Sequence, residues 1–213
     1  KYDNFNFIDL KLIFYYLNND LINLKKTFIK LQKHNKLNIS NTLLYSEKLF
    51  DQNEYDKIFS LLYPYFNDNK LSIEGIQLLL KVALELNDLT FYLEVSDSLY
   101  KKYPFLPLSH EILINALMRN KNYEAASKII IRAKNRFQNY YNFLIFEAKI
   151  EVINDNLSSA INIYKYILKQ DDTLVDVKYD LALLHNKVEK YILCDDIFLE
   201  LLNIDPGNLI FIS

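Results

Sequence analysis

The chain has 213 residues, a formal net charge of −2 and 51% hydrophobic residues, which excludes intrinsic disorder and argues against a general nucleic-acid binder. Two glycines and four prolines cannot supply the turns of a sheet-rich fold of this size, so the composition favours an all-helical protein. The two glycines, Gly75 and Gly207, cannot form a glycine-rich phosphate-binding loop. The single cysteine, Cys194, excludes an internal disulfide and a CxxC zinc site.

Features that bear on the compartment leave it open. No stretch reaches about 18 consecutive apolar residues, so the sequence predicts no transmembrane helix. The chain begins at Lys1 without an initiator methionine or a basic and apolar leader, which indicates a fragment or a processed product. A cytoplasmic or periplasmic protein, or one attached to a membrane through parts of a longer chain, fits these data equally well.

In chain order, apolar residues recur at helical spacing in runs of about a dozen residues, paired across short polar turns. Each pair of runs predicts a helical hairpin. The hairpins occupy residues 5–38, 39–72, 73–106, 107–140, 141–174 and 175–208, and residues 209–213 are expected to start a further helix. Leu21, Tyr55, Leu89, Tyr123, Leu157 and Tyr191 hold equivalent places after the polar turns. The sequence is therefore a repeat with a period of about 34 residues.

The period and two short segments resemble the tetratricopeptide repeat, a helix–turn–helix of about 34 residues. The segments are NYEAA at residues 122–126 and LLNIDPGN at residues 201–208, the latter similar to the end of the family's consensus repeat. The resemblance implies an all-α, right-handed solenoid of about six hairpins in a single domain. Hairpins of this kind stack because one alone cannot bury its apolar face.

Four residues depart from the family pattern. Pro64 is expected to end or kink the second helix of its hairpin near Leu62. Tyr92 stands where the family has a small residue and predicts a locally shifted helix. Lys11 and Glu147 occupy places that the family gives to a core leucine. The register of the first and third hairpins stays open for these reasons.

Residues capable of catalysis are few. His34, His110 and His185 fall at three different places in the repeat, so we expect them to point from different faces rather than to form a metal or acid–base cluster. His185 is expected to pack in the core with its polar end hydrogen-bonded, and Cys194 to be a buried, inert thiol. The sequence thus predicts no catalytic residue, no cofactor and no metal, and a protein that is not an enzyme.

The resemblance places peptide binding on the first helices, whose inner faces line the concave wall in this family. The groove-facing candidates on the periodic frame are Glu47, Gln77, Lys81, Glu111, Asn115, Arg119, Lys149, Tyr179, Leu183 and Asn186. One subclass clamps a C-terminal carboxylate with Lys and Asn four places apart, but here Glu111 stands where that lysine belongs before Asn115. A chaperone C-terminal tail is therefore not expected, and the mixed groove favours a ligand with charged and apolar anchors.

Charge is unevenly distributed among the hairpins. Residues 5–38 and 107–140 each carry a net charge of +4, whereas residues 175–208 carry −4. The basic residues lie on second helices, which the resemblance places on the convex wall: Lys25, Lys26, Lys30, Lys33, Lys128, Arg132, Lys134 and Arg136. A solvated surface is the simplest interpretation, and a contact for an acidic partner or anionic lipid headgroups is the alternative.

Taken together, these features predict a non-catalytic scaffold that binds a protein or peptide through its solenoid surface, with assembly of a larger or envelope-associated complex as one setting. An RNA-binding protein of the pentatricopeptide type is an alternative, although its repeats are about 35 residues long and usually basic. A regulatory or targeting segment of a larger enzyme is another. The apolar residues 209–213 predict that the chain continues past Ser213 and that the exposed C-terminal hairpin self-associates.

Overall fold

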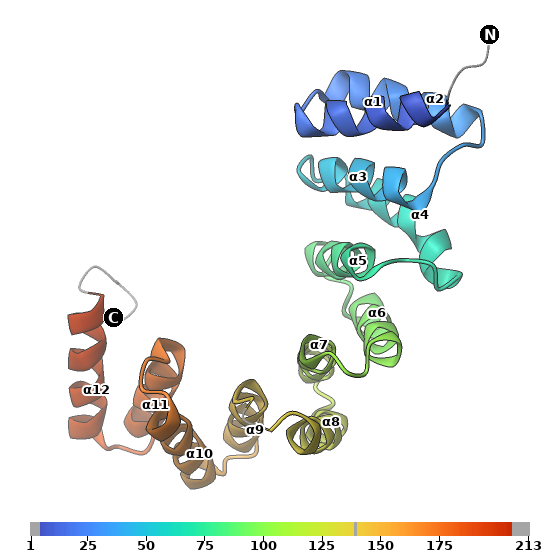
Figure 1. Cartoon of the computed structure of the whole chain (residues 1–213). Coiled ribbons are helices and arrows are strands. Elements are labelled where there is room, and N and C mark those ends of the chain that lie inside the picture. The colour runs from blue at the N-terminus through green and yellow to red at the C-terminus, as the bar shows by residue number, and fades with distance from the viewer. Residues whose placement is uncertain (1–4, 139, 206–213) are drawn as a thin grey trace. The chain divides into compact units, whose positions relative to one another are not determined.

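The structure is a computed structural model that describes residues 5–138 and 140–205 (Figure 1). These residues form twelve α-helices in sequential antiparallel pairs, and no strand occurs among them. The all-helical prediction with about six hairpins is confirmed. The longest described helices have 14 residues, and none of the described helices is long and apolar enough to cross a bilayer. The further helix predicted at residues 209–213 lies outside the described residues.

The helices group into two compact units, one ending at Tyr103 and the other beginning at Pro104. In the N-terminal unit the helices are α1 (Phe5–Leu17), α2 (Leu21–Lys33), α3 (Ile39–Phe50), α4 (Tyr55–Asn67), α5 (Ile73–Glu85) and α6 (Leu89–Lys102). In the C-terminal unit they are α7 (Pro107–Arg119), α8 (Tyr123–Arg136), α9 (Asn142–Ile153), α10 (Leu157–Gln170), α11 (Val175–Lys187) and α12 (Tyr191–Ile204). The second helices begin one full period apart throughout, whereas α9 begins one residue later than the period predicts.

The turn inside each hairpin explains how the chain folds with so little glycine. The residue two places before each second helix has a positive φ, and these residues also recur once in each period: Asn19, Asn53, Asn87, Lys121, Asp155 and Glu189. Asparagine and aspartate enter this left-handed region more readily than most residues because their short side chains bond locally. Asparagine makes three of these turns and aspartate a fourth, whereas Lys121 and Glu189 adopt the left-handed conformation in the other two.

Side-chain caps fix where several second helices begin. Asp20 accepts a hydrogen bond from the backbone N–H of Asn23 at 3.1 Å, and Asp88 accepts one from Phe91 at 2.9 Å. Asn122 accepts the equivalent bond from Ala125 at 3.2 Å. Such caps satisfy backbone donors that the first turn of a helix leaves unpaired.

The core of each unit consists of the facing sides of the two helices in each hairpin and of the contacts between its successive hairpins. In the N-terminal unit, Leu12 of α1 and Leu24, Phe28 and Leu31 of α2 belong to one buried cluster. In the C-terminal unit, α9, α10 and α11 share another, whose members are Ala148, Ala160, Ile161, Tyr164, Ile167, Val177, Leu181 and Leu184. Small residues such as Ala148 and Ala160 permit close approach of the helices, while Tyr164 fills the space between layers.

The predicted end of one second helix and the predicted shift of another are wrong. Helix α4 does not end near Leu62 but runs through Pro64 to Asn67, and the Pro64 carbonyl accepts a bond from the Asp68 N–H at 3.1 Å. Pro64 is exposed in the last turn, where its missing N–H removes one hydrogen bond of the helix, and a kink at this proline stays a prediction. Helix α6 is not shifted by Tyr92, because Tyr92 is buried in the same stripe as Val95 and Leu99.

The two charged residues at core-leucine places do not enter the core. Lys11 is exposed, and its ammonium lies 4.7 Å from the centre of the Phe7 ring. Glu147 is half-buried and pairs with Lys134 of the preceding helix at 2.5 Å. The repeat thus accepts a charge at these places where solvent or an opposite charge is within reach.

Candidate functional site

The groove candidates of the N-terminal unit lie on α3 and α5. Glu47 accepts a hydrogen bond of 2.6 Å from the hydroxyl of Tyr16, and this contact joins α3 to α1. The bond to the carboxylate, together with burial, raises the pKa of Tyr16 to about 12. Gln77 is half-buried and Lys81 is exposed on α5. Glu47 therefore serves a link within the fold.

On α7 the candidates are bonded to their own unit as well. The Glu111 carboxylate accepts a bond from Asn142 Nδ2 at 3.0 Å and, by its hydrogen bond with Tyr140, raises the pKa of that phenol to about 12. The Asn115 side chain accepts a bond of 2.8 Å from Nε of Arg119, one turn further along the helix. The place of the carboxylate clamp thus holds an acidic residue that is already bonded.

A groove with a volume of about 350 Å³ is lined by α7, α9 and α11, with one residue from α10. We call it the α9–α11 groove. Its lining residues are Met118, Lys149, Val152, Ile153, Tyr164, Asp180, Leu183 and Leu184. Lys149 and Leu183 are the two sequence-predicted candidates that the structure brings together here.

The polar part of the groove centres on Asp180. The Tyr164 hydroxyl donates a hydrogen bond of 3.1 Å to the Asp180 carboxylate, and Lys149 Nζ lies 3.8 Å from the same oxygen. Burial, then the charge of Asp180, raises the pKa of Tyr164 well above its usual value. Tyr164 is buried, whereas about half of the Lys149 side chain is exposed. The groove therefore combines an apolar floor with a fixed carboxylate and a cation that solvent reaches.

The lining of the α9–α11 groove differs from the sequence-predicted candidates at six residues: two candidates on α11 lie outside it, and four lining residues were not among the candidates. Tyr179 packs edge-on against the Phe198 ring of α12, and Asn186 is exposed; neither lines the groove. Met118, Val152, Ile153 and Asp180 line the groove but were missed. Met118 and Val152 hold the place of Asn186 in the two preceding hairpins, so the periodic frame that selected Asn186 also pointed to them.

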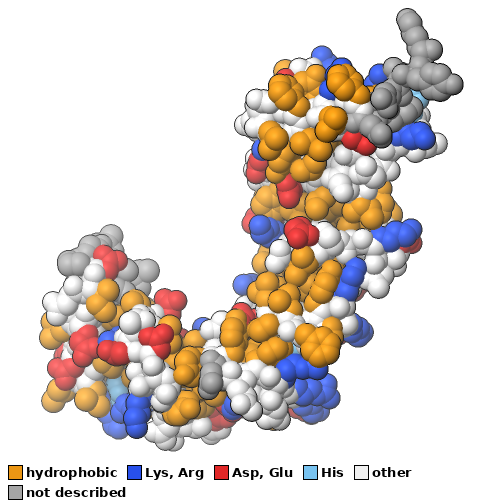
Figure 2. Space-filling model, viewed as in Figure 1, with side chains coloured by type: hydrophobic (Ala, Val, Ile, Leu, Met, Phe, Trp, Pro, Cys, Tyr) orange, Lys and Arg blue, Asp and Glu red, His pale blue; other side chains and the backbone are white. Residues whose placement is uncertain are grey.

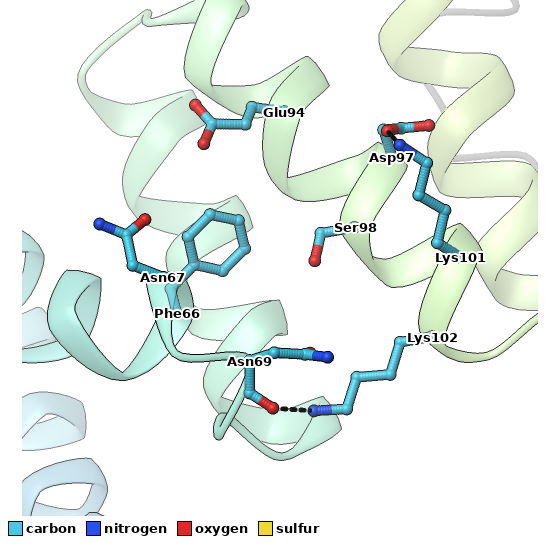
Figure 3. A pocket seen from close by; sticks show the side chains of 8 residues that line it. All are labelled: Phe66, Asn67, Asn69, Glu94, Asp97, Ser98, Lys101 and Lys102. Carbon is cyan, nitrogen blue, oxygen red and sulfur yellow. Dashed lines mark hydrogen bonds and ion pairs between the residues drawn. The ribbon is translucent and has the colours of Figure 1, made fainter.

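A second hollow, of about 450 Å³, lies between α4 and α6 in the N-terminal unit (Figure 3). Its cations are engaged in the fold: Lys101 pairs with Asp97 at 2.5 Å, and Lys102 donates to the carbonyls of Asn69 at 3.0 Å and Leu71 at 2.7 Å. Lys102 thereby ties the end of α6 to the turn before α5. Lys101 and Lys102 are therefore held by short contacts within the fold, whereas Lys149 of the α9–α11 groove lies 3.8 Å from its carboxylate.

The predicted convex basic residues differ between the two units. On α2, Lys25, Lys26, Lys30 and Lys33 are all exposed. On α8, Lys128 pairs with Glu124 at 2.6 Å and Lys134 pairs with Glu147. Arg136 donates to the Pro104 carbonyl at 2.7 Å and covers the Phe105 ring, while Arg132 is exposed. Much of the basic charge on α8 is therefore balanced or used inside the C-terminal unit.

The histidines and the cysteine lie in separate surroundings. His34 follows α2 and is exposed, whereas His110 and His185 are buried in α7 and α11. His110 Nδ1 lies 3.2 Å from the Leu106 carbonyl, but the prediction that His185 has its polar end bonded is wrong for Nδ1, which has no partner among the described residues. Burial lowers the pKa of both buried imidazoles and raises that of the Cys194 thiol. Within residues 5–138 and 140–205, no three His, Cys, Asp or Glu side chains could hold a metal ion.

Comparison by sequence gives no match to a protein-family model or to a curated protein. Comparison by structure gives many. The TPR protein TTC0263 of Thermus thermophilus is 18% identical over 81% of this chain and 94% of its own, with a TM-score of 0.60. A TPR protein of Parabacteroides merdae is 12% identical over 93% of this chain and 78% of its own, with a TM-score of 0.76.

A third similar structure is YrrB, described as a TPR protein with an unusual peptide-binding site. It is 12% identical over 87% of this chain and 95% of its own, with a TM-score of 0.59. At these identities the likeness concerns the fold. The helical hairpins, their regular spacing and these neighbours agree, and the chain has the tetratricopeptide-repeat fold.

Proposed function

We propose that the chain is a non-catalytic scaffold that binds a partner protein or peptide in the α9–α11 groove. The observation that carries the proposal is the open apolar floor of Met118, Val152 and Leu183 beside the Lys149–Asp180 pair. Ligand sites commonly combine a largely apolar lining with a few polar groups that fix orientation. The peptide-binding site in the description of YrrB belongs to a protein of the same fold and supports the same class of function.

The groove suits a peptide with one large apolar side chain and an adjacent acidic group. Burial of a leucine-sized side chain on this floor contributes about 1.5–3 kcal/mol, and the flexible side chain of Met118 adapts to its shape. Lys149 holds Asp180 at 3.8 Å, longer than a good hydrogen bond, so its ammonium can turn to a carboxylate of the ligand. The bonded Tyr164 hydroxyl keeps Asp180 in place meanwhile.

Two other ligand classes fit less well. A C-terminal carboxylate clamp would need a cation where Glu111 accepts a bond from Asn142. An RNA ligand at this groove would need several cations beside it, but Lys149 lies near Asp180, and Lys128 and Lys134 of α8 are paired with carboxylates. A protein ligand with apolar and acidic anchors is therefore the better candidate.

The test is selection of peptides from a random display library on the purified chain, followed by titration of the best peptide. Lys81 and Lys149 stand at the place of Leu183 in other hairpins, so the fold should tolerate the substitution Leu183→Lys. We expect it to weaken peptide binding by about tenfold or more, because it removes apolar floor. Ile131→Lys is the matched control on α8: Ile131 is 58% exposed and Lys165 stands at its place in the next hairpin.

Equal effects of the two substitutions would contradict the proposed site. A library that yields no binding peptide, together with tight binding of single-stranded RNA that falls steeply with salt, would contradict the proposed ligand class.

A further inference from the structure

Helix α1 exposes an apolar face. Phe7, Leu10 and Phe14 are 58%, 62% and 60% exposed, while Leu12 on the opposite side is fully buried against α2. Figure 2 shows hydrophobic side chains on the surface of this first hairpin, at the top of the view. Three large apolar side chains at this spacing form a continuous patch, and such patches usually mark an interaction site. We call these three residues the α1 face.

The repeat itself shows what kind of element covers such a face. At the place of Phe7 the other first helices carry Asn41, Gly75, Ser109, Phe143 and Val177, and all five are buried. At the place of Leu10 they carry Leu44, Leu78, Ile112, Phe146 and Asp180, each buried or half-buried. Within each unit, neighbouring hairpins meet at these places. Asn41 donates to Asp9 of the preceding first helix at 2.7 Å, and Asp180 accepts from Tyr164 of the preceding second helix.

Helix α12 offers the complementary surface. Phe198 is only half-buried, although Phe28, Leu62, Ser96, Ile130 and Tyr164 at the same place of earlier second helices are all buried. Phe198 holds the place of Tyr164 in the repeat, and Leu10 holds the place of Asp180. A contact between Phe198 and Leu10 would therefore be the apolar equivalent of the contact between Tyr164 and Asp180. A hairpin α11–α12 stacked on α1 as the repeat stacks elsewhere would place Phe198 against Leu10.

Charge favours the same pairing. Residues 5–38 carry +4 and residues 175–208 carry −4, and the exposed charges include Lys26 and Lys33 on α2 and Asp195 and Asp196 on α12. Two N-terminal hairpins repel each other by their net charge, whereas the N-terminal and C-terminal hairpins attract each other.

We infer that the α1 face binds the α11–α12 hairpin of a second copy of this chain. The two surfaces differ, so the contact is heterologous, and in each assembly one α1 face and one α11–α12 hairpin can pair again. Association therefore continues past the dimer as concentration rises. It weakens with added salt because opposite charges contribute, but it persists because the contact is mainly apolar.

Sedimentation velocity at chain concentrations from on the order of 1 to 300 µM tests this inference. Asp180 stands at the place of Leu10 in the last hairpin, so an aspartate is compatible with the fold there. Leu10→Asp is expected to raise the dissociation constant for self-association by about tenfold or more. Leu17→Asp is the matched control on the same helix. Leu17 is 74% exposed, and Asp51, Glu85, Arg119, Ile153 and Lys187 at its place are all exposed, so this variant should associate as the parent chain does.

Mixing tests the head-to-tail direction. Phe198→Ser, which introduces the residue found at Ser96, should weaken self-association as Leu10→Asp does. At a concentration where each variant alone is monomeric, a mixture of the two should form a dimer that grows no further. Far-ultraviolet circular dichroism checks that each variant keeps its helices. If Leu10→Asp does not fold, Phe14→Lys replaces it, because Lys48 stands at the place of Phe14 in the next hairpin. A chain that stays monomeric throughout, a dimer that does not grow, or equal effects of Leu10→Asp and Leu17→Asp would each overturn the inference.

Discussion

The N-terminal and C-terminal units share one hairpin plan but use the surfaces of their first helices differently. In the N-terminal unit, polar side chains on these helices join one another: Tyr16 bonds Glu47, and Asn41 bonds Asp9. In the C-terminal unit, α7 and α9 are joined in the same way through Glu111 and Asn142, but α9 and α11 leave an apolar groove with a half-exposed lysine. The repeat thus fixes helix packing, while a few inner-face residues decide whether a surface is closed or available.

The largest expected effect on stability comes from comparing two phenylalanines at equivalent positions of the repeat. Phe143 is fully buried in α9, whereas Phe7 at the same place in α1 is 58% exposed. Phe143→Ala should lower the free energy of unfolding by about 3–5 kcal/mol, because it leaves a cavity in the core. Phe7→Ala should change it by less than about 0.5 kcal/mol, as is usual at an exposed position. Urea denaturation of both variants gives the difference, and similar losses would show that the α1 face is covered within the chain.

A second test concerns the close helix approach in the C-terminal unit. Ala160 is fully buried in α10 within the cluster that supports the groove. Ala160→Leu should lower the free energy of unfolding by about 1–3 kcal/mol through overpacking. Cys194→Ala is expected to cost less, because Ala126 and Ala160 stand at the place of Cys194. Thermal denaturation measures both changes, and a larger loss for Cys194→Ala would contradict the assignment of Cys194 as a small core residue.

A third test weakens a link of the N-terminal unit. Lys102 donates to the carbonyls of Asn69 and Leu71, whereas its neighbour Lys101 is an exposed side chain paired with Asp97. Lys102→Met should lower the free energy of unfolding by about 1–2 kcal/mol, because two charge-assisted hydrogen bonds are lost. The control Lys101→Met should cost about 0–0.5 kcal/mol, the usual value of a surface pair within one helix. Equal costs in chemical denaturation would show that Lys102 is not a link.

The smallest expected effect is a loss of stability at alkaline pH. The pKa of Tyr16 is raised to about 12 by its hydrogen bond to Glu47, above the ordinary value of 10.0. Because the folded pKa is the higher one, the stabilisation is complete below about pH 10 and is lost as the pH rises towards about 12. Spectroscopic titration of tyrosinate should show late ionisation that shifts to lower pH in Glu47→Gln. A titration unchanged by that substitution would contradict the link between Tyr16 and Glu47.

Much of the fold could be predicted because the apolar pattern repeats with a constant period. Equivalent residues such as Ala126, Ala160 and Cys194 occupy equivalent buried places, so one clear hairpin identifies the others. The errors arise where one residue was judged by its general tendency. Pro64 costs one hydrogen bond in an otherwise continuous helix, and Tyr92 is held in register by the buried residues that follow it.

The candidate site could be predicted only in part. Lys149 and Leu183 followed from the periodic frame, but Asp180 did not, because its importance lies in a bond to Tyr164 on a different helix. Tyr179 shares the inner-face pattern yet packs against Phe198, a contact that depends on the angle between two helices. Periodicity tells which residues share a face, whereas the neighbours of each side chain come from the packing.

Site-specific photocrosslinking tests the central claim most directly. A photoreactive phenylalanine analogue at Leu183, and separately at Ile131, would be irradiated with a saturating amount of the selected peptide. The α9–α11 groove predicts crosslinking from the analogue at Leu183, which lines it, and none from the analogue at Ile131 on α8. Crosslinking from Ile131 but not from Leu183 would contradict the claim that this chain binds its partner in the groove.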